Sequence, residues 1–281
     1  MSRLWRSRVV VLTAVLLAFA VVAAACSPSE EEVAETSTTT STTEATTTTT
    51  TTEAPQTTTT EPKPQKPYGG EAIVADDEEP PTLNPYAPGG SKTIVSLIGQ
   101  GYLTGVQDVD GYTLELIPEV VTELPTTANG GVEVNDEDGT MTVVYTIKDE
   151  AVWADGTPIS GADFKFTYDA IMDPTQPIGK ATYEDIIPES IVVGPKTFEY
   201  TLAAPTAFYE LIFGTLIPKH SVEGSDLVAD WDETMWVSGG PFMFDQWVKG
   251  DSITLVRNEN YWKTDPVTDQ QLPYLDTVTF T

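Results

Sequence analysis

The clearest pattern of apolar and polar positions lies in residues 145–173 and predicts a strand, a tight turn and a capped helix. Residues 145–147 alternate between apolar and polar side chains, which is typical of a half-buried strand. Asp155-Gly156 predicts a turn, because glycine accepts a positive φ at little steric cost. Ser160, followed three residues later by an acidic side chain, predicts a capping box at a helix start.

The helix predicted over residues 161–172 carries apolar positions at helical spacing and should bury one face. Those positions are Phe164, Thr167, Tyr168 and Ile171. Asp173-Pro174 should end the helix, because the residue before a proline avoids the helical conformation.

The rest of the chain from residue 68 onward predicts a mixture of short strands and helices. Strands are predicted over 71–75, 141–147, 191–193, 198–202, 242–247, 252–257 and 274–281. The strand at 141–147 should form a hairpin with the stretch before residue 135, and the strands at 242–247 and 252–257 should form a second hairpin. Further helices are predicted over 93–101 and 207–216, the latter with Phe208, Leu211, Ile212 and Thr215 on its buried face. This order predicts an α/β fold of the mixed α+β type.

The N-terminus has the pattern of an export signal over residues 1–25. Three arginines precede an apolar run over residues 9–25, which ends in small residues before Cys26, the only cysteine. A single cysteine at that boundary favours lipid attachment at Cys26, as in bacterial lipoproteins. A plain secretory cleavage site and an uncleaved membrane anchor stay open as alternatives.

Residues 26–67 predict a linker, because threonine and proline dominate and almost no apolar surface is available to bury. A flexible chain of about 40 residues has a root-mean-square reach of roughly 35 Å, enough to hold a lipid-anchored domain away from a membrane. Its threonines could also carry O-linked sugars, although a passive spacer is the simpler interpretation.

The chain is strongly acidic, with 43 acidic against 14 basic residues and a net charge of −29. Such a surface repels phosphate backbones, so nucleic acid is excluded as a partner. The acidity favours either cationic ligands or simply solubility outside the cell, and charge balance alone argues more for solubility.

No set of side chains in the sequence forms a convincing catalytic or metal-binding group, so the prediction is a non-enzyme without metal or cofactor. His220 is the only histidine, and its position after a proline and a lysine indicates a capping or surface role at a helix end. The acidic run at residues 76–79 precedes two prolines and reads as a solvated loop. Two loops resemble calcium sites but carry Val106 and Val134 in place of the first ligand.

Several segments, in this order, resemble the extracellular solute-binding proteins of the peptide/nickel-binding family. The chief one is Trp153-Ala154-Asp155-Gly156-Thr157-Pro158, with Ser160, Asp163 and Phe164 following. Others are residues 81–85 (PTLNP), 217–220 (IPKH), 239–242 (GGPF) and 257–262 (RNENYW). Gly161 stands where the family usually has alanine and Gly239 where threonine is usual; Gly161 is expected to weaken the first helical turn slightly.

The resemblance implies that residues 68–281 form the N-terminal lobe of a two-lobe fold like the type II periplasmic binding proteins, ending before the second lobe. It also implies an ABC-importer component that captures a peptide or related small solute and delivers it to permease subunits, at the outer face of the membrane. The ligand-contacting residues expected on this basis are Ala87, Pro88, Gly89 and Gly90, Gln176 and Thr182, and Gly240 and Phe242.

Two other interpretations fit parts of the sequence. A cell-surface adhesion or scaffold lipoprotein would also use a threonine-rich stalk and an acidic domain. A hydrolase of the cell envelope is the weaker rival, since no persuasive pair of carboxylates is present.

Overall fold

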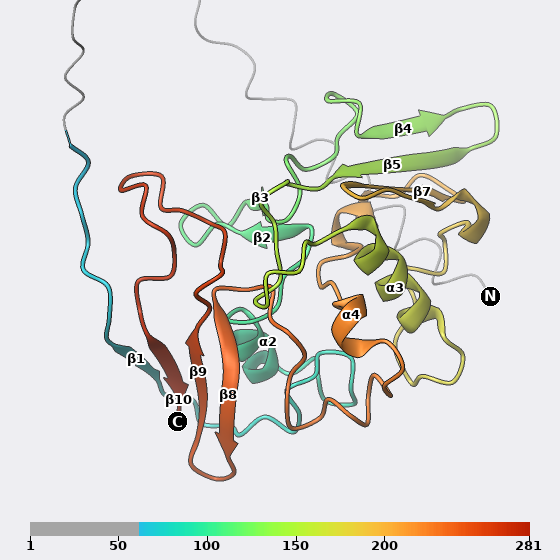
Figure 1. Ribbon diagram of the computed structural model, residues 1–281. Helices are drawn as coiled ribbons and strands as arrows, with labels where there is room; N and C mark the ends of the chain where they lie inside the picture. The colour runs from blue at the N-terminus through green and yellow to red at the C-terminus, as the bar shows by residue number, and fades with distance from the viewer. Residues whose placement is uncertain (1–61) are drawn as a thin grey trace, which may run out of the picture. The chain divides into compact units, whose positions relative to one another are not determined.

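The computed structural model of the protein describes residues 62–281 (Figure 1). The predicted signal peptide, Cys26 and most of the predicted linker lie outside the described residues. In chain order the strands are β1 (Glu71–Val74), β2 (Gln107–Val109), β3 (Leu116–Pro118), β4 (Val132–Asn135), β5 (Thr140–Thr146), β6 (Val192–Val193), β7 (Thr197–Leu202), β8 (Phe242–Val248), β9 (Ser252–Arg257) and β10 (Thr277–Phe280). The helices are α2 (Thr93–Gly99), α3 (Gly161–Met172) and α4 (Lys219–Val222), with 3₁₀ turns η1 (Pro188–Ser190) and η2 (Ala207–Leu211).

One sheet joins the two ends of the described chain. Its strand order is β1-β10-β9-β8, with β1 parallel to β10 and the other pairs antiparallel. The predicted hairpin of β8 and β9 is confirmed, and its turn contains Gly250 at φ +75°. The first and last described strands therefore lie side by side, and α2 packs beside this sheet (Figure 1).

The second sheet has the order β4-β5-β7-β6, and all of its pairs are antiparallel. β5 alternates between buried and half-exposed positions, as the period of two in the sequence predicts. Helix α3 covers this sheet with the predicted residues Phe164, Thr167, Tyr168 and Ile171, all of which are buried. The two remaining strands, β2 and β3, form a separate hairpin.

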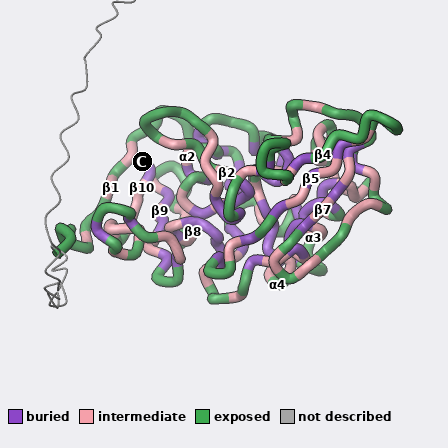
Figure 2. The backbone as a smooth tube through the Cα atoms, turned by 90° about the horizontal axis from the view of Figure 1, so that it is seen from above, coloured by how far each residue is buried: buried purple, intermediate pink, exposed green. Residues whose placement is uncertain are grey.

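Each sheet has its own apolar core, and Figure 2 shows buried positions gathered along the inner strands of both. Around α3, aromatic rings pack closely, with Phe213 in contact with the rings of Tyr145, Phe164, Tyr183, Phe198 and Tyr200. Around α2, the core is mainly aliphatic and includes Leu83, Ile94, Ile98, Ile253 and Leu255. Tyr86 packs against both cores and so lies at their junction.

The predicted turn and helix cap are confirmed, and the structure shows what they hold. Gly156 has φ +84°, and Ser160 and Asp163 form a reciprocal capping box at the start of α3. The buried Asp163 also accepts a hydrogen bond from the backbone N–H of Lys219 at 3.0 Å, so one carboxylate caps α3 and α4 together.

Gly161 has a packing role that the sequence did not indicate, and the expected weakening of the first helical turn stays a prediction. A Cβ at this position would lie 2.4 Å from the carbonyl oxygen of Thr197 and 2.6 Å from that of Gly194. The glycine is therefore required by the close approach of α3 to the turn before β7, a tertiary contact that helix propensity does not include.

The helix predicted over residues 207–216 is wrong. Only the 3₁₀ turn η2 forms, and Phe208 and Leu211, which were expected on the buried face, are exposed. Phe213 adopts a left-handed φ of +60° and enters the core, after which Leu216 N–H donates to the carbonyl of Thr104 at 2.8 Å. Pairing with another part of the chain has overridden the local helical pattern.

His220 lies within the short helix α4, whose N-cap is Pro218, and it is exposed, in line with the expected surface role at a helix end. Its Nε2 lies 2.9 Å from Oδ2 of Asp155. The histidine therefore ties α4 to the turn before α3. Within residues 62–281 no helix combines the length and the apolar character needed to cross a bilayer.

Candidate functional site

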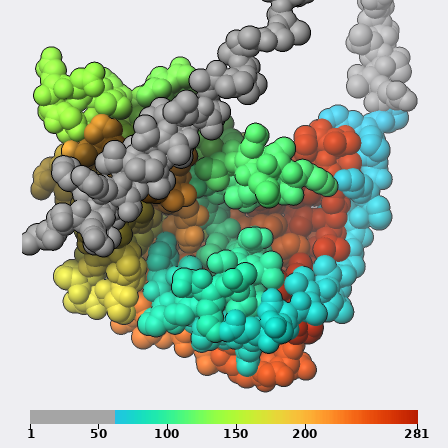
Figure 3. Space-filling view, turned by 180° about the vertical axis from the view of Figure 1, so that it is seen from behind, coloured from blue at the N-terminus to red at the C-terminus, as the bar shows by residue number. Residues whose placement is uncertain are grey.

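A polar groove of about 330 Å³ opens where the two cores meet, between α2 and the β2–β3 hairpin. Figure 3 shows this recess on the rear face, between the blue-green segment that contains α2 and the green hairpin. Its lining residues come from several separate parts of the chain: Pro85, Val95, Ser96, Gly99, Gln100, Leu103, Thr104, Gly105, Gln107, Asp108, Glu119, Gly214, Thr215, Pro241 and Tyr261.

Three backbone segments run side by side beneath the groove. Val106 N–H donates to the carbonyl of Phe213 at 3.0 Å, and Glu119 N–H donates to the carbonyl of Val106 at 2.9 Å. A Cβ at Gly105 would lie 2.1 Å from the carbonyl oxygen of Gly214, so this contact requires glycine. The groove therefore rests on a hydrogen-bonded base whose shape is fixed before a ligand arrives.

A buried ion pair lies at one side of the groove. The side chain of Glu119 is 7% exposed and its Oε2 contacts the ammonium of Lys263, while Tyr261 OH donates to Oε1 at 3.3 Å. Burial raises the pKa of the Tyr261 hydroxyl above its usual value, so the hydroxyl stays protonated and available as a donor. The carboxylate of Asp108 lines the same groove and is exposed. Two acidic groups and one basic group thus give this side a net negative charge.

Thr104, in the wall of the groove, has an unusual side-chain environment. It is 5% exposed, and its hydroxyl has no hydrogen-bond partner among the described residues. A Cβ at Gly239 would lie 2.1 Å from the Thr104 methyl, so a side chain at residue 239 would require Thr104 to move. A buried hydroxyl without a partner costs about 1–3 kcal/mol, so a polar group that reached it would gain a hydrogen bond at little cost.

The loop expected to contact a ligand, Ala87 to Gly90, follows Pro85 at the edge of the groove. Its glycines have a local structural role: Gly89 has φ +92°, and a Cβ at Gly90 would lie 2.3 Å from the carbonyl oxygen of Asn84. The N–H of Gly90 donates to the carbonyl of Ala87 at 2.8 Å, so this loop is a preformed turn. Ligand contact by these residues stays a prediction.

The other expected residues lie in two places. Gly240 and Phe242 are buried and donate their N–H groups to Tyr102 and Gly101 at 3.2 and 2.8 Å, while Pro241 between them lines the groove. Gln176 and Thr182 lie in the half-exposed loop after α3 and are not among the groove's lining residues. Their roles likewise stay predictions.

Sequence reasoning missed most of the groove. Its walls come from α2, from residues 103–108 and from Glu119, none of which the family segments include. One usable signal was present, because Glu119 interrupts an apolar run between Ile117-Pro118 and Val120-Val121. A charged residue in such a run needs a partner when it is buried, and that partner, Lys263, lies far away in the sequence.

The arrangement suits non-covalent binding of a polar solute. The groove offers carboxylates, amides and hydroxyls above its hydrogen-bonded backbone base, and such polar groups can fix the orientation of a small molecule. Within residues 62–281, no group of three or more metal-ligating side chains comes together.

Comparison with known proteins matches this architecture. Residues 115–281 match the family described as bacterial extracellular solute-binding proteins, family 5 Middle. The oligopeptide-binding protein OppA of Bacillus subtilis is 26% identical over 148 residues, which are 45% of this chain and 27% of that protein. The periplasmic oligopeptide-binding protein OppA of Salmonella typhimurium is 26% identical over 204 residues, 60% of this chain and 37% of that protein.

Among solved structures, the oligopeptide-binding protein of Thermus thermophilus in complex with a pentapeptide superposes with a TM-score of 0.61 at 21% identity. The superposition covers 75% of this chain and 40% of that one. The chain thus spans well under half the length of these relatives.

Proposed function

Because this chain belongs to the bacterial extracellular solute-binding proteins of family 5, we propose that it is the substrate-binding component of an ABC importer. Its fold is that of a partial lobe of the type II periplasmic binding proteins, as the sequence predicted. In this proposal the protein captures a peptide or a related small solute outside the membrane and delivers it to the permease without altering it.

The groove between the two cores is the observation that carries this proposal. It combines a rigid backbone base with polar side chains that have capacity for further hydrogen bonds, namely Gln100, Gln107 and Asp108. Relatives that match the chain are named oligopeptide-binding proteins, which supports a peptide as the first ligand class to test. Ala87 to Gly90 would contact the ligand from the edge of the groove next to Pro85.

The exported location is part of the same proposal. Residues 1–25 would direct export, Cys26 would carry the lipid anchor, and residues 26–67 would link the anchor to the solute-binding domain of residues 68–281. Retention of radiolabelled fatty acid by the wild-type protein, and its loss in Cys26→Ser, would test the anchor.

Ligand capture can be tested with one groove-filling variant and a control on the same helix. Ser96 is exposed on α2 and lines the groove, whereas Thr93 is exposed on α2 and does not. Ser96→Trp should fill the groove without disturbing either core, while Thr93→Trp should leave it open. The measurement is the shift in melting temperature on addition of short peptides of mixed sequence, nickel chelates, haem and sugars.

Wild type and Thr93→Trp are expected to be stabilised by at least one of these solutes, and Ser96→Trp by none. A ligand at 100 times its dissociation constant stabilises by about 2.7 kcal/mol, which such an experiment resolves easily. The proposal is overturned if no solute shifts the wild type, or if the shift survives in Ser96→Trp.

A further inference from the structure

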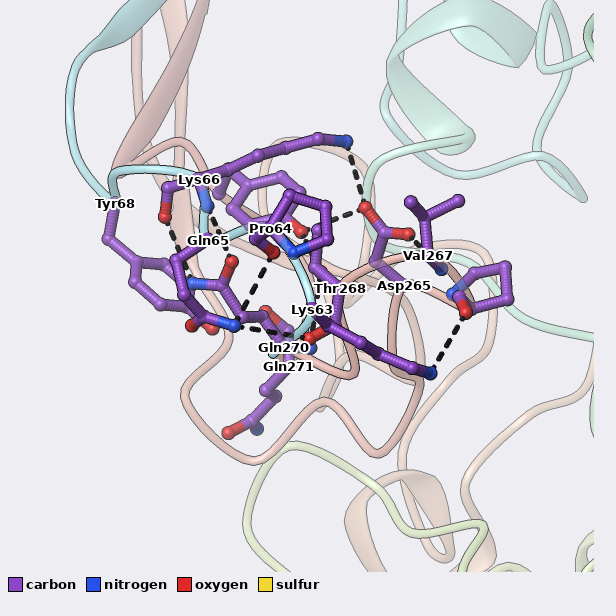
Figure 4. A network of polar contacts seen from close by, with 12 residues as sticks. Lys63, Pro64, Gln65, Lys66, Tyr68, Asp265, Val267, Thr268, Gln270 and Gln271 are labelled. Atoms are coloured by element: carbon purple, nitrogen blue, oxygen red, sulfur yellow. Dashed lines mark hydrogen bonds and ion pairs between the residues drawn. The ribbon is translucent and has the colours of Figure 1, made fainter. Parts of the chain in front are cut away.

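The segment Lys63–Tyr68, just before β1, lies extended along the loop formed by residues 263–274 (Figure 4). The side-chain amide of Gln270 pairs with both backbone groups of Lys66: Lys66 N–H donates to Oε1 at 2.7 Å, and Nε2 donates to the Lys66 carbonyl at 2.9 Å. Two-way pairing of this kind is what a neighbouring strand offers to an extended peptide. The side chain of Gln270 in the loop therefore binds the main chain of the segment at Lys66.

Two lysines of the segment meet two aspartates of the loop. Lys63 Nζ lies 2.6 Å from Oδ1 of Asp269, and Lys66 Nζ lies 2.8 Å from Oδ2 of Asp265. Asp265 is held in place from its own side as well, because it accepts hydrogen bonds from Val267 N–H and Tyr274 OH, each at 2.8 Å. The loop itself thus orients the Asp265 carboxylate toward the Lys66 ammonium.

The loop has an internal structure that does not depend on the segment. Leu272 N–H donates to the carbonyl of Lys263 at 2.9 Å, and Asp265 N–H donates to the carbonyl of Gln270 at 2.8 Å. Asp269 N–H closes a further turn onto the carbonyl of Asp265 at 2.8 Å. These bonds present Gln270 and both carboxylates on a preformed surface, which lowers the entropy cost of docking.

The segment is equally well suited to dock. Its sequence is Lys63-Pro64-Gln65-Lys66-Pro67-Tyr68, so each lysine precedes a proline and is biased toward extended backbone. At its end the Tyr68 ring packs on Tyr274, with ring centres 5.5 Å apart, and Tyr68 OH donates to the carbonyl of Gln271 at 2.8 Å. The chain then continues into β1.

From these contacts we propose that residues 263–274 form a docking site specific for an extended lysine–proline segment of the form Lys-Pro-x-Lys-Pro, occupied by the chain's own residues 63–67. With the segment docked, the preceding sequence would leave the domain at Lys63 instead of at residue 68. The same loop begins at Lys263, which contacts Glu119 beside the groove.

Amide hydrogen exchange in the full chain, followed residue by residue by NMR, tests the site. The Lys66 amide should exchange on the order of tenfold or more slowly than in an unstructured peptide, because it donates a hydrogen bond to the Gln270 side chain. Gln270→Ala and the double variant Asp265→Asn/Asp269→Asn should remove this protection. The control Asp76→Asn/Asp77→Asn removes two exposed carboxylates elsewhere and should not.

A second pair of variants separates recognition of lysine charge from simple packing. Lys63→Arg/Lys66→Arg keeps the positive charges and should retain most of the protection, whereas Lys63→Gln/Lys66→Gln should lose it. The Leu272 amide, bonded within the loop, reports whether the loop itself stays folded in every variant. A loss of protection at both Lys66 and Leu272 in the site variants would overturn the claim of a preformed site.

The proposal is also overturned if the Lys66 amide of the wild type exchanges at the peptide rate, or if the glutamine variant keeps its protection. Protection that disappears on dilution would show that the segment comes from a second copy, and would overturn occupation by the chain's own residues. None of these measurements requires a solute, so they are independent of the proposed transport function.

Discussion

The buried pair of Glu119 and Lys263 gives the sharpest test of how the groove is held together. Replacing Lys263 with methionine leaves the Glu119 carboxylate, whose side chain is 7% exposed, without its cation. Removing one partner of a buried pair typically costs 3–5 kcal/mol. The Lys263 side chain is 21% exposed and Tyr261 still donates to Glu119, so the expected loss in free energy of unfolding is at the lower end, about 3 kcal/mol.

The complementary change should cost less. Glu119→Gln leaves an ammonium that can reach water through its exposed fraction, so the expected loss is about 1–2 kcal/mol. The double variant Glu119→Gln/Lys263→Met removes both charges, and it should be more stable than Lys263→Met alone. A coupling free energy of about 2 kcal/mol is therefore expected across the cycle.

Urea unfolding followed by circular dichroism measures all four proteins. Lys165→Met serves as the control, since Lys165 forms an exposed pair with Asp169 on the surface of α3, for which a change below about 0.5 kcal/mol is expected. The reasoning fails if Lys263→Met lies within 0.5 kcal/mol of the wild type. It fails equally if the two single changes add without coupling.

Three further predictions follow from single contacts. Gly161→Ala should lower the free energy of unfolding, measured in urea, by about 1–3 kcal/mol, because the added methyl would overlap two backbone oxygens. The control Gly179→Ala places its methyl in open space and should be neutral or stabilising, and equal effects of the two changes would contradict this prediction. Thr104→Val should raise the free energy of unfolding by about 1 kcal/mol, since it removes a buried hydroxyl that has no partner among the described residues, and a loss of stability would show that the hydroxyl is bonded. The hydrogen bond from Lys66 holds the pKa of Asp265 below its usual value, so docking should persist above about pH 4 and be lost only as the pH falls through this lowered pKa. In an NMR titration, the pKa of the Asp265 carboxyl group should be higher in Lys66→Gln than in the wild type, and an unchanged pKa would refute the pairing.

Local patterns predicted much of this fold correctly because their causes are local. The turn at Gly156, the capping box of Ser160 and the buried face of α3 depend on residues within a few positions of each other. The hairpin of β8 and β9 likewise follows from alternation on both sides of a short turn. The family segments extended these predictions to the type II fold.

The same family segments have mainly structural roles in the molecule. Asp155 meets His220, and Asp163 caps both α3 and α4, so the two best-matched segments stabilise each other away from the groove. Only Pro85, Pro241 and Tyr261 in these segments line the groove. A strong sequence signature therefore identified the family without locating the site.

The sequence alone determined the elements that follow from neighbouring residues, the acidic surface and the family of this protein. Tertiary structure decided the conformation of residues 207–216, the need for glycine at residue 161, the pairing of Glu119 with Lys263 and the docking of Lys66 on Gln270. Each of these depends on groups that are distant in the sequence and meet only in the folded chain. The free energies of these contacts come from close packing and from the desolvation of buried groups where distant segments touch. The pattern of residues along one segment therefore does not predict them.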